Sequence, residues 1–239
     1  MAQLVELFVH EVPRVFRDMR ATIWITVALF LGMGLLGWLL VAFNPELASL
    51  FASEKMIEMV QQGELWTDDL LNVVPSSVLS VHIMANNIMV SLFAFALGAL
   101  YGLGTVYIIG LNGLMLGGIF AFTARYDMAG RLFNFVIAHG VVELSVICLA
   151  GAAGIQLGNA LVHPGLKTRT TAFREAVGHA ATLLPVVVLF LVGAGLIEAF
   201  ISPDERYPLV IRSAVGMAYG VLLWSVLSGR IWRWKSNRP

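Results

Sequence analysis

The sequence predicts an all-α fold: a polytopic α-helical membrane protein with about six transmembrane helices and both termini in the cytoplasm. Of its 239 residues, 59% are hydrophobic and 13% are charged, whereas soluble domains carry about 25% charged residues. The mean hydropathy is +0.83. Uncharged runs of helix length recur along the chain, and Lys and Arg divide unevenly between the two sides that these runs define. We therefore expect residues 1–239 to form a single integral membrane domain in a lipid bilayer.

The first 43 residues predict two elements. Residues 1–20 alternate apolar and charged positions at helical spacing, which is typical of an amphipathic N-terminal helix on the membrane surface. A solvated lead-in to the first span is the alternative. Residues 21–43 carry no charge and are long enough to cross a bilayer. A signal peptide has a shorter apolar region, so this run is an uncleaved transmembrane helix.

The next segment, 44–77, is acidic and ends at Pro75-Ser76-Ser77, a turn signal. Its apolar residues have roughly helical spacing, and Trp66 suits an interfacial depth. We expect an extracytoplasmic interfacial segment with a short helix lying on the membrane.

Residues 78–123 contain no formal charge, which leaves two interpretations open. The first is two full spans, the second and third of the protein, with a break at 101–105. The second is a re-entrant hairpin of two half-helices, which is tolerated only where protein or a water-filled cavity covers its backbone.

The remaining apolar runs predict three more spans, over 132–162, 179–201 and 208–227. Ten of the 15 Lys and Arg residues then fall on the side of the two termini, which places that side in the cytoplasm. In the fourth span His139 would lie about 12 Å below the outer surface. Glu143 would lie one turn deeper, near the bilayer midplane.

Polar side chains interrupt these apolar runs and define a candidate site. His82 and Asn86 are four residues apart, as are His139 and Glu143, so each pair would share a helix face. Ionisable groups at membrane depth are costly and mark functional sites; the alternative is that they fix helix register. The predicted intramembrane polar cluster in the outer half of the bilayer contains His82, Asn86, Asn87, His139, Glu143 and Glu198.

A second group of residues predicts close helix packing. Small residues four apart let helix backbones approach each other, and they also suit a subunit interface. Asn112 would lie at inner or middle depth and belong to the packing of the hairpin. The predicted packing residues are Asn112, Gly98, Gly102, Gly113, Gly117, Gly154 and Gly158, with Gly216 and Gly220 at the same spacing.

Several classes of function find no support. The sequence contains no Walker phosphate loop, no His-Glu-x-x-His zinc helix and no Gly-x-Ser-x-Gly nucleophile elbow. We therefore expect no enzyme, no catalytic residues, no cofactor and no metal. Two histidines and two acids could in principle bind a divalent metal ion, but no ligand spacing requires one. The formal net charge of zero offers no argument for nucleic-acid binding, and the single cysteine cannot form an intrachain disulfide.

Four motifs in order resemble the stage II sporulation protein M family of integral membrane proteins. They cover about 78–203, the family-like core, and consist of Asn86-Asn87, Asn112-Gly113 with Gly117, His139-Gly140-x-x-Glu143, and Gly195-Leu196-Ile197-Glu198-Ala199-Phe200-Ile201-x-Pro203. The resemblance implies a polytopic helical protein in a bacterial or archaeal cytoplasmic (inner) membrane. In spore formers the named member looks like a scaffold for cell-wall-degrading partners during engulfment, but relatives also occur in organisms that do not sporulate.

Two functional hypotheses follow. The first is a non-enzymatic integral membrane protein that scaffolds or anchors envelope protein partners, as a homo-oligomer. The alternative is a transporter or channel component that moves a proton, cation or small polar solute through His139 and Glu143.

Overall fold

The computed structural model describes residues 2–67, 76–204 and 206–231. Every regular element within these ranges is helical, which confirms the predicted all-α class. Five helical stretches are long and apolar enough to cross a membrane, so the chain is a multi-pass membrane protein. They are Arg20–Phe43, Leu103–Ala124, Gly140–Val162, Arg169–Phe200 and Leu209–Leu227.

The helices follow one another with short connections. In chain order they are α1 (Ala2–Glu6), the π-helical turn η1 (Leu7–Glu11), α2 (Val12–Asp18), α3 (Arg20–Phe43), the 3-10 turn η2 (Pro45–Leu50), α4 (Glu54–Gln61), α6 (Ser76–Ala96), the 3-10 turn η3 (Leu97–Ala99), α7 (Leu103–Ala124), α8 (Ala129–Val136), α9 (Gly140–Val162), α10 (Arg169–Ala181), α11 (Leu184–Phe200) and α12 (Leu209–Leu227).

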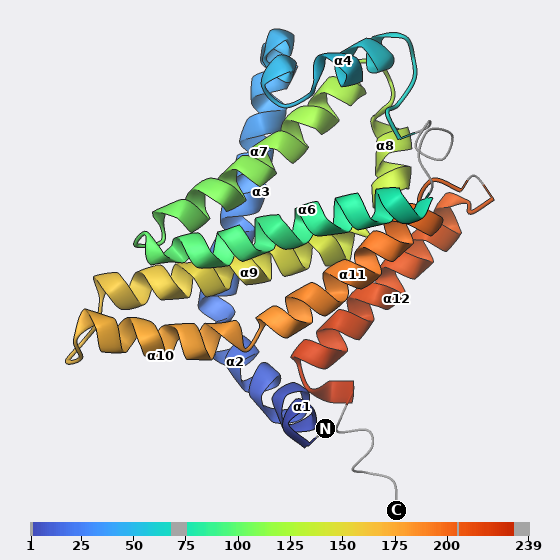
Figure 1. Ribbon diagram of the computed structural model, residues 1–239. Coiled ribbons are helices and arrows are strands. Elements are labelled where there is room, and N and C mark those ends of the chain that lie inside the picture. The colour runs from blue at the N-terminus through green and yellow to red at the C-terminus, as the bar shows by residue number, and fades with distance from the viewer. Residues whose placement is uncertain (1, 68–75, 205, 232–239) are drawn as a thin grey trace, which may run out of the picture.

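Helix α9 is the centre of the bundle. In its most apolar stretch 67% of the residues are buried, against 22% in α3 and in α12. Helices α6 and α11 pack against α9, as do α3 and α10 (Figure 1). The middle of α9, 150–154, contains only Ala and Gly, and such small side chains let neighbouring backbones come close. The packing around α9 therefore determines where its side chains can reach.

The turn between α6 and α7 is tight. Tyr101 and Gly102 both have positive φ, of 55° and 82°, and glycine adopts this left-handed conformation without steric cost. Helix α6 runs parallel to α9, with Gly98 against Gly154 and Gly102 against Gly158. The predicted break at 101–105 is therefore correct to within a few residues.

A second glycine contact joins α3 to α7. A Cβ on Gly117 would lie 1.8 Å from the carbonyl oxygen of Gly34, and a Cβ on Gly113 would lie 2.3 Å from that of Phe30. Contacts this short leave no room for any side chain. Glycine at both positions lets the two helices lie side by side (Figure 1).

The N-terminal helices pack onto the bundle. Val12, Val15 and Met19 are almost completely buried in a cluster that includes residues of α9, α11 and α12, and the rings of Phe16 and Trp224 meet edge to face at 5.8 Å. We predicted a membrane surface as the partner of this apolar face, with a solvated lead-in as the alternative. The protein itself covers part of that face.

Two predicted spans are interrupted. The run 132–162 is divided between α8 and α9, with Ile137–His139 between them, and the run 179–201 is divided between α10 and α11. The prediction of one continuous helix through His139 is wrong. His139 is the N-cap of α9, so Glu143 lies in the first turn of that helix and not in the middle of a span.

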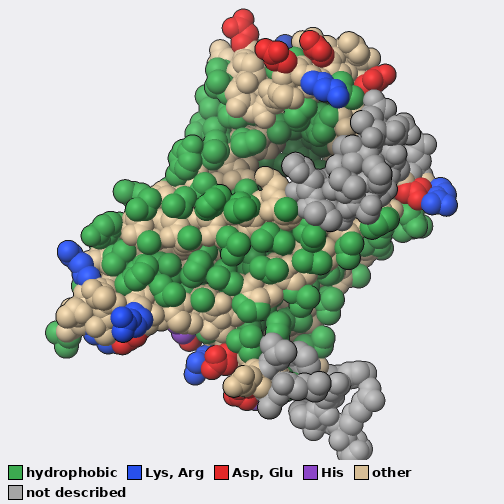
Figure 2. Space-filling view, in the orientation of Figure 1, with side chains coloured by type: hydrophobic (Ala, Val, Ile, Leu, Met, Phe, Trp, Pro, Cys, Tyr) green, Lys and Arg blue, Asp and Glu red, His purple; other side chains and the backbone are tan. Residues whose placement is uncertain are grey.

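Charged side chains gather at opposite ends of the molecule. Figure 2 shows a broad hydrophobic band between an acidic end over η2 and α4 and a mixed-charge end near α2 and the α9–α10 connection. Large apolar side chains are exposed across this band, among them Trp24, Leu31 and Met217. An exposed apolar belt of this extent is the surface that a protein presents to lipid.

Candidate functional site

The candidate site begins at the elbow between α8 and α9. The chain turns at Ile137–His139, and the carbonyl of His139 accepts the first backbone hydrogen bonds of α9, from Val142 and Glu143, each at 3.1 Å. This geometry brings the side chains of His139 and Glu143 to the same side of the helix start. Nε2 of His139 lies 3.9 Å from Oε2 of Glu143.

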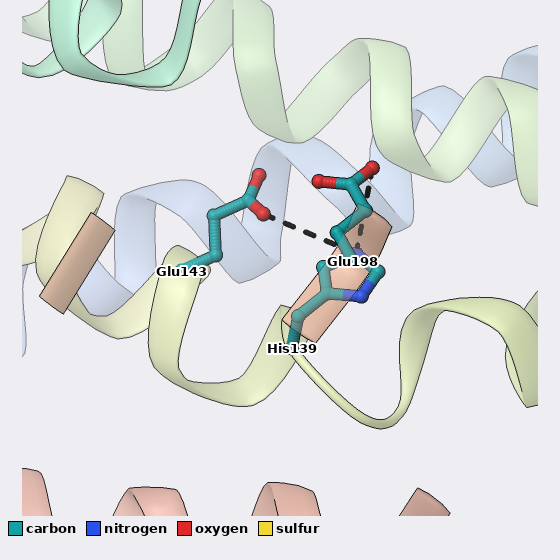
Figure 3. Close-up of side chains that lie close together, drawn as sticks. All are labelled: His139, Glu143 and Glu198. Carbon is teal, nitrogen blue, oxygen red and sulfur yellow. Dashed lines mark ion pairs between the residues drawn. The ribbon is translucent and has the colours of Figure 1, made fainter. Parts of the chain in front are cut away.

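Helix α11 adds a second carboxylate to the same imidazole. Glu198 lies in its last turn, and Oε1 of Glu198 is 3.8 Å from Nε2 of His139. Figure 3 shows both carboxylates turned towards the ring of His139. One ligand atom of each of the three residues lies within 4.8 Å of the others, which is the arrangement of residues that can hold a proton or a metal ion.

Two hydrogen bonds from residues outside this group of three orient the side chains of Glu143 and His139. Asn87 of α6 donates through Nδ2 to Oε1 of Glu143 at 2.8 Å. Ser202, just after α11, pairs with Nδ1 of His139 at 2.9 Å. The ring of Phe135 meets the imidazole edge to face at 5.7 Å. The cluster therefore joins α6, α8, α9 and α11 at one end of the bundle.

The three side chains are shielded from solvent. Their exposed fractions are 5% for His139, 15% for Glu143 and 12% for Glu198. Oε2 of Glu198 is buried and has no hydrogen-bond partner among the described residues. Within the described residues, neither carboxylate forms an ion pair with Lys or Arg. Burying two carboxylates beside one imidazole is costly unless a positive charge compensates them.

A polar cavity adjoins the cluster. Its volume is about 450 Å³, and its lining includes Phe135 and Ser202, the two residues that contact His139 from this side. Arg212 also lines it and donates to the backbone carbonyls of Asn134 and Asp204 at 3.3 and 2.9 Å. Among the described residues its lining does not include His139, Glu143 or Glu198, so the cavity adjoins the cluster only through Phe135 and Ser202.

The loop that carries Ser202 contains an ion pair between Asp204 and Arg206. The carboxylate of Asp204 accepts two hydrogen bonds from Nε of Arg206, at 2.9 and 3.0 Å, and one from Nη2 at 2.6 Å. These hydrogen bonds lower the pKa of the Asp204 carboxyl to about 2. Asp204 and Arg206 are two residues apart, so this ion pair lies within the loop.

The remaining predicted site residues lie elsewhere. Asn86 is exposed and makes no hydrogen bond with the described residues, because neighbouring positions on a helix point about 100° apart. The side chain of His82 lies outside the described residues. Asn112 donates to the carbonyl of Ile108 in its own helix at 2.8 Å. The structure therefore brings together Asn87, His139, Glu143 and Glu198 of the six predicted members.

Sequence reasoning missed two contributors to the site, Ser202 and Phe135. A usable signal existed for Ser202. It follows Glu198 by four residues, the same spacing that singled out His139 and Glu143. No signal identified Phe135, because apolar side chains are common throughout this chain.

The fold and the site together define a class: a multi-pass helical membrane protein with a His–carboxylate cluster buried at one end of its bundle. Comparison with protein-family models matches residues 26–203 to the family described as Stage II sporulation protein M. The chain belongs to this family. The match also includes most of α3, from residue 26, and the segment 44–77, which the four sequence motifs did not cover. Searches of curated proteins and of solved structures found no match.

Proposed function

We propose that this protein is a non-enzymatic membrane scaffold that anchors envelope proteins at its extracytoplasmic end, in the cytoplasmic membrane of a bacterium or archaeon. The observation that carries the proposal is the position of the polar cluster. It ties α6, α9, α11 and the 201–204 loop together at the end of the bundle where α4 and α8 lie. A cluster placed there holds the partner-facing end of the scaffold in one arrangement.

The packing of α9 next to the cluster favours a scaffold role over a transport role. Beyond Glu143, residues 146–154 of α9 are all buried and carry no charged side chain. Gly154 lies against the backbone of α6, where a Cβ would come within 2.2 Å of the carbonyl oxygen of Ala94. Close backbone contact leaves no space for a hydrated ion along that face of α9. The site thus adjoins the cavity through Phe135 and Ser202 at one end and lies against apolar packing at the other.

Transport of a proton or cation is the second candidate, and it has one specific observation in its favour. Oε2 of Glu198 is buried without a hydrogen-bond partner in the part of the chain that the structure describes, and intramembrane carboxylates of this kind serve as proton or ion relays. Proteoliposome measurements separate the two functions. A scaffold gives no ion flux above that of empty vesicles, whereas a pH- or cation-driven flux that Glu143→Gln abolishes would overturn the proposal.

Partner anchoring has its own test. A photo-crosslinking residue in place of Glu46 or Glu58, both exposed at the acidic end, should capture a discrete envelope protein in living cells. The same residue in place of Leu35, exposed in the hydrophobic band, should not. Equal yields of crosslinked protein at the two kinds of position would contradict anchoring at this end. Crosslinks between two copies of the chain would report the proposed homo-oligomer.

A hydrolytic enzyme is a weaker interpretation of the same residues. Ser202, His139 and the carboxylates follow the order of a catalytic triad, but Ser202 is 1% exposed. The distances of 3.8 and 3.9 Å between the imidazole and the carboxylates exceed a hydrogen bond. A nucleophile must be accessible to its substrate, so burial of Ser202 favours a structural role for its hydroxyl group.

The topology is also part of the proposal: six crossings with both termini in the cytoplasm. Helix α6 supports it, because it lies beside α9, where Asn87 contacts Glu143. It has 21 residues and is therefore about 30 Å long, more than a half-helix would reach.

Cysteine labelling tests this topology. With Cys148→Ser as background, an impermeant thiol reagent should label Ser49→Cys in intact spheroplasts and Thr170→Cys only after lysis. The opposite pattern would refute the orientation.

A further inference from the structure

We propose that His139, Glu143 and Glu198 bind Zn²⁺ or a similar divalent ion of the first transition row. This inference does not depend on the scaffold role, since a bound ion could serve a scaffold or a transporter equally.

The direction of the ligand atoms is the first argument. Nε2 of His139 faces Oε2 of Glu143 and Oε1 of Glu198, and the ligand atoms of the three residues lie within 4.8 Å of one another. Metal–ligand bonds of about 2.0–2.2 Å place two ligands of a tetrahedral ion about 3.4 Å apart. The distances of 3.8 and 3.9 Å from Nε2 exceed this by a few tenths of an ångström, an amount that side-chain rotation provides.

The hydrogen bonds behind the ligands are the second argument. Ser202 holds Nδ1 of His139, which leaves Nε2 to face the centre. Asn87 holds Oε1 of Glu143, which leaves Oε2 to face the same point. Metal-binding histidines and carboxylates are characteristically oriented by hydrogen bonds through the atom that does not bind the metal. Two of the three proposed ligands follow this pattern.

The balance of charge is the third argument. Glu198 lies in the last turn of α11, where the negative end of the helix dipole disfavours a carboxylate. Its Oε2 is buried without a hydrogen-bond partner, and no Lys or Arg in the described part of the chain pairs with it. A divalent cation beside Nε2 would compensate both carboxylates at once.

The ligand types indicate which ion fits. Imidazole nitrogen suits Zn²⁺ and its first-row neighbours, whereas Mg²⁺ and Ca²⁺ prefer sites made of oxygen ligands alone. Three protein ligands would leave one position of a tetrahedral ion open. The cavity of about 450 Å³ adjoins the site through Phe135 and Ser202, and we expect a water molecule to complete the coordination.

The test uses the full-length protein in lipid nanodiscs, purified through a tag that contains no histidine and stripped with a chelator. Calorimetric titration with Zn²⁺ in excess Mg²⁺ should show one site per chain, and Co²⁺ should give the visible absorption of a four-coordinate ion. Glu198→Gln and Glu143→Gln should each weaken Zn²⁺ binding at least tenfold. Glu46→Gln, an exposed acid distant from the cluster, should bind as the unaltered protein does.

Two results would overturn the inference. One is the absence of stoichiometric Zn²⁺ binding and of the Co²⁺ spectrum in the unaltered protein. This measurement involves no variant, so a folding defect of a variant does not affect it. The other is equal affinity in the unaltered protein and in a Glu198→Gln variant that elutes as a single folded species. Such binding would belong to a site that does not include Glu198.

Discussion

Replacing Gly117 by Ala should separate α3 from α7, and the structure sets the size of the effect. A Cβ at this position would lie 1.8 Å from the carbonyl oxygen of Gly34, and real Cβ contacts are essentially never shorter than 3.0 Å. The obstructing atoms are helix backbone, so no side-chain rotation relieves the contact. Overpacking of this kind costs about 1–3 kcal/mol.

Gly32→Ala is the matched control. Gly32 lies in α3, and a Cβ there would meet nothing within 4 Å. Both substitutions gain the same helix propensity of about 1 kcal/mol, so the difference between their unfolding free energies isolates the contact. We expect Gly117→Ala to be less stable than Gly32→Ala by about 1–3 kcal/mol, or about 5- to 150-fold in the unfolding equilibrium constant.

Denaturant titration of the purified variants in mixed micelles, followed by Trp fluorescence, measures this difference. Gly117→Val should lower stability further, because each added methyl group meets the same backbone. Equal stability of Gly117→Ala and Gly32→Ala would refute the argument that close backbone contact holds the α3–α7 pair together.

Two further substitutions test hydrogen bonds inside the bundle. Asn87→Ala should destabilise the protein by about 1–3 kcal/mol, because Oε1 of Glu143 loses its hydrogen-bond donor. Asn86→Ala, at an exposed position, should change the unfolding midpoint little. Equal destabilisation by the two substitutions would contradict the Asn87–Glu143 hydrogen bond. Tyr219→Phe should cost about 0.6 kcal/mol, since it removes the hydroxyl that donates to the carbonyl of Phe190 at 3.0 Å and keeps the stacked rings. A loss above about 2 kcal/mol in the same titration would show that the ring packing had changed too.

Periodicity and hydropathy were sufficient to predict most of the helices. An uncharged run over 21–43 became α3 (Arg20–Phe43), and one over 208–227 became α12 (Leu209–Leu227). Long apolar runs predict helices well because backbone polar groups in lipid must be bonded within the segment. A uniformly apolar run, however, does not indicate where its helix is interrupted. The interruption at 137–139 contains neither Gly nor Pro, and Gly140, which follows it, is one of 23 glycines in the chain, so the local sequence does not distinguish it from continuous helix.

The site was predicted in part for a related reason. Spacing of four residues identified His139 with Glu143, and depth brought in Glu198 from a distant helix. Spacing could not choose between Asn86 and Asn87, since that choice depends on how α6 rotates about its axis against α9. Ser202 lies beyond the end of α11, in a loop whose path no periodicity describes.

The break before α9 matters because it creates the electrostatic setting of Glu143. In an uninterrupted helix Glu143 would lie in the interior, where the dipoles of successive peptide groups cancel. As the structure stands, Glu143 lies in the first turn of α9, where unpaired backbone N–H groups and the positive end of the helix dipole stabilise a carboxylate. Glu198, in the last turn of α11, experiences the opposite field. The two carboxylates that share His139 are therefore not equivalent, and Glu198 is the one whose charge depends most on a bound cation or proton.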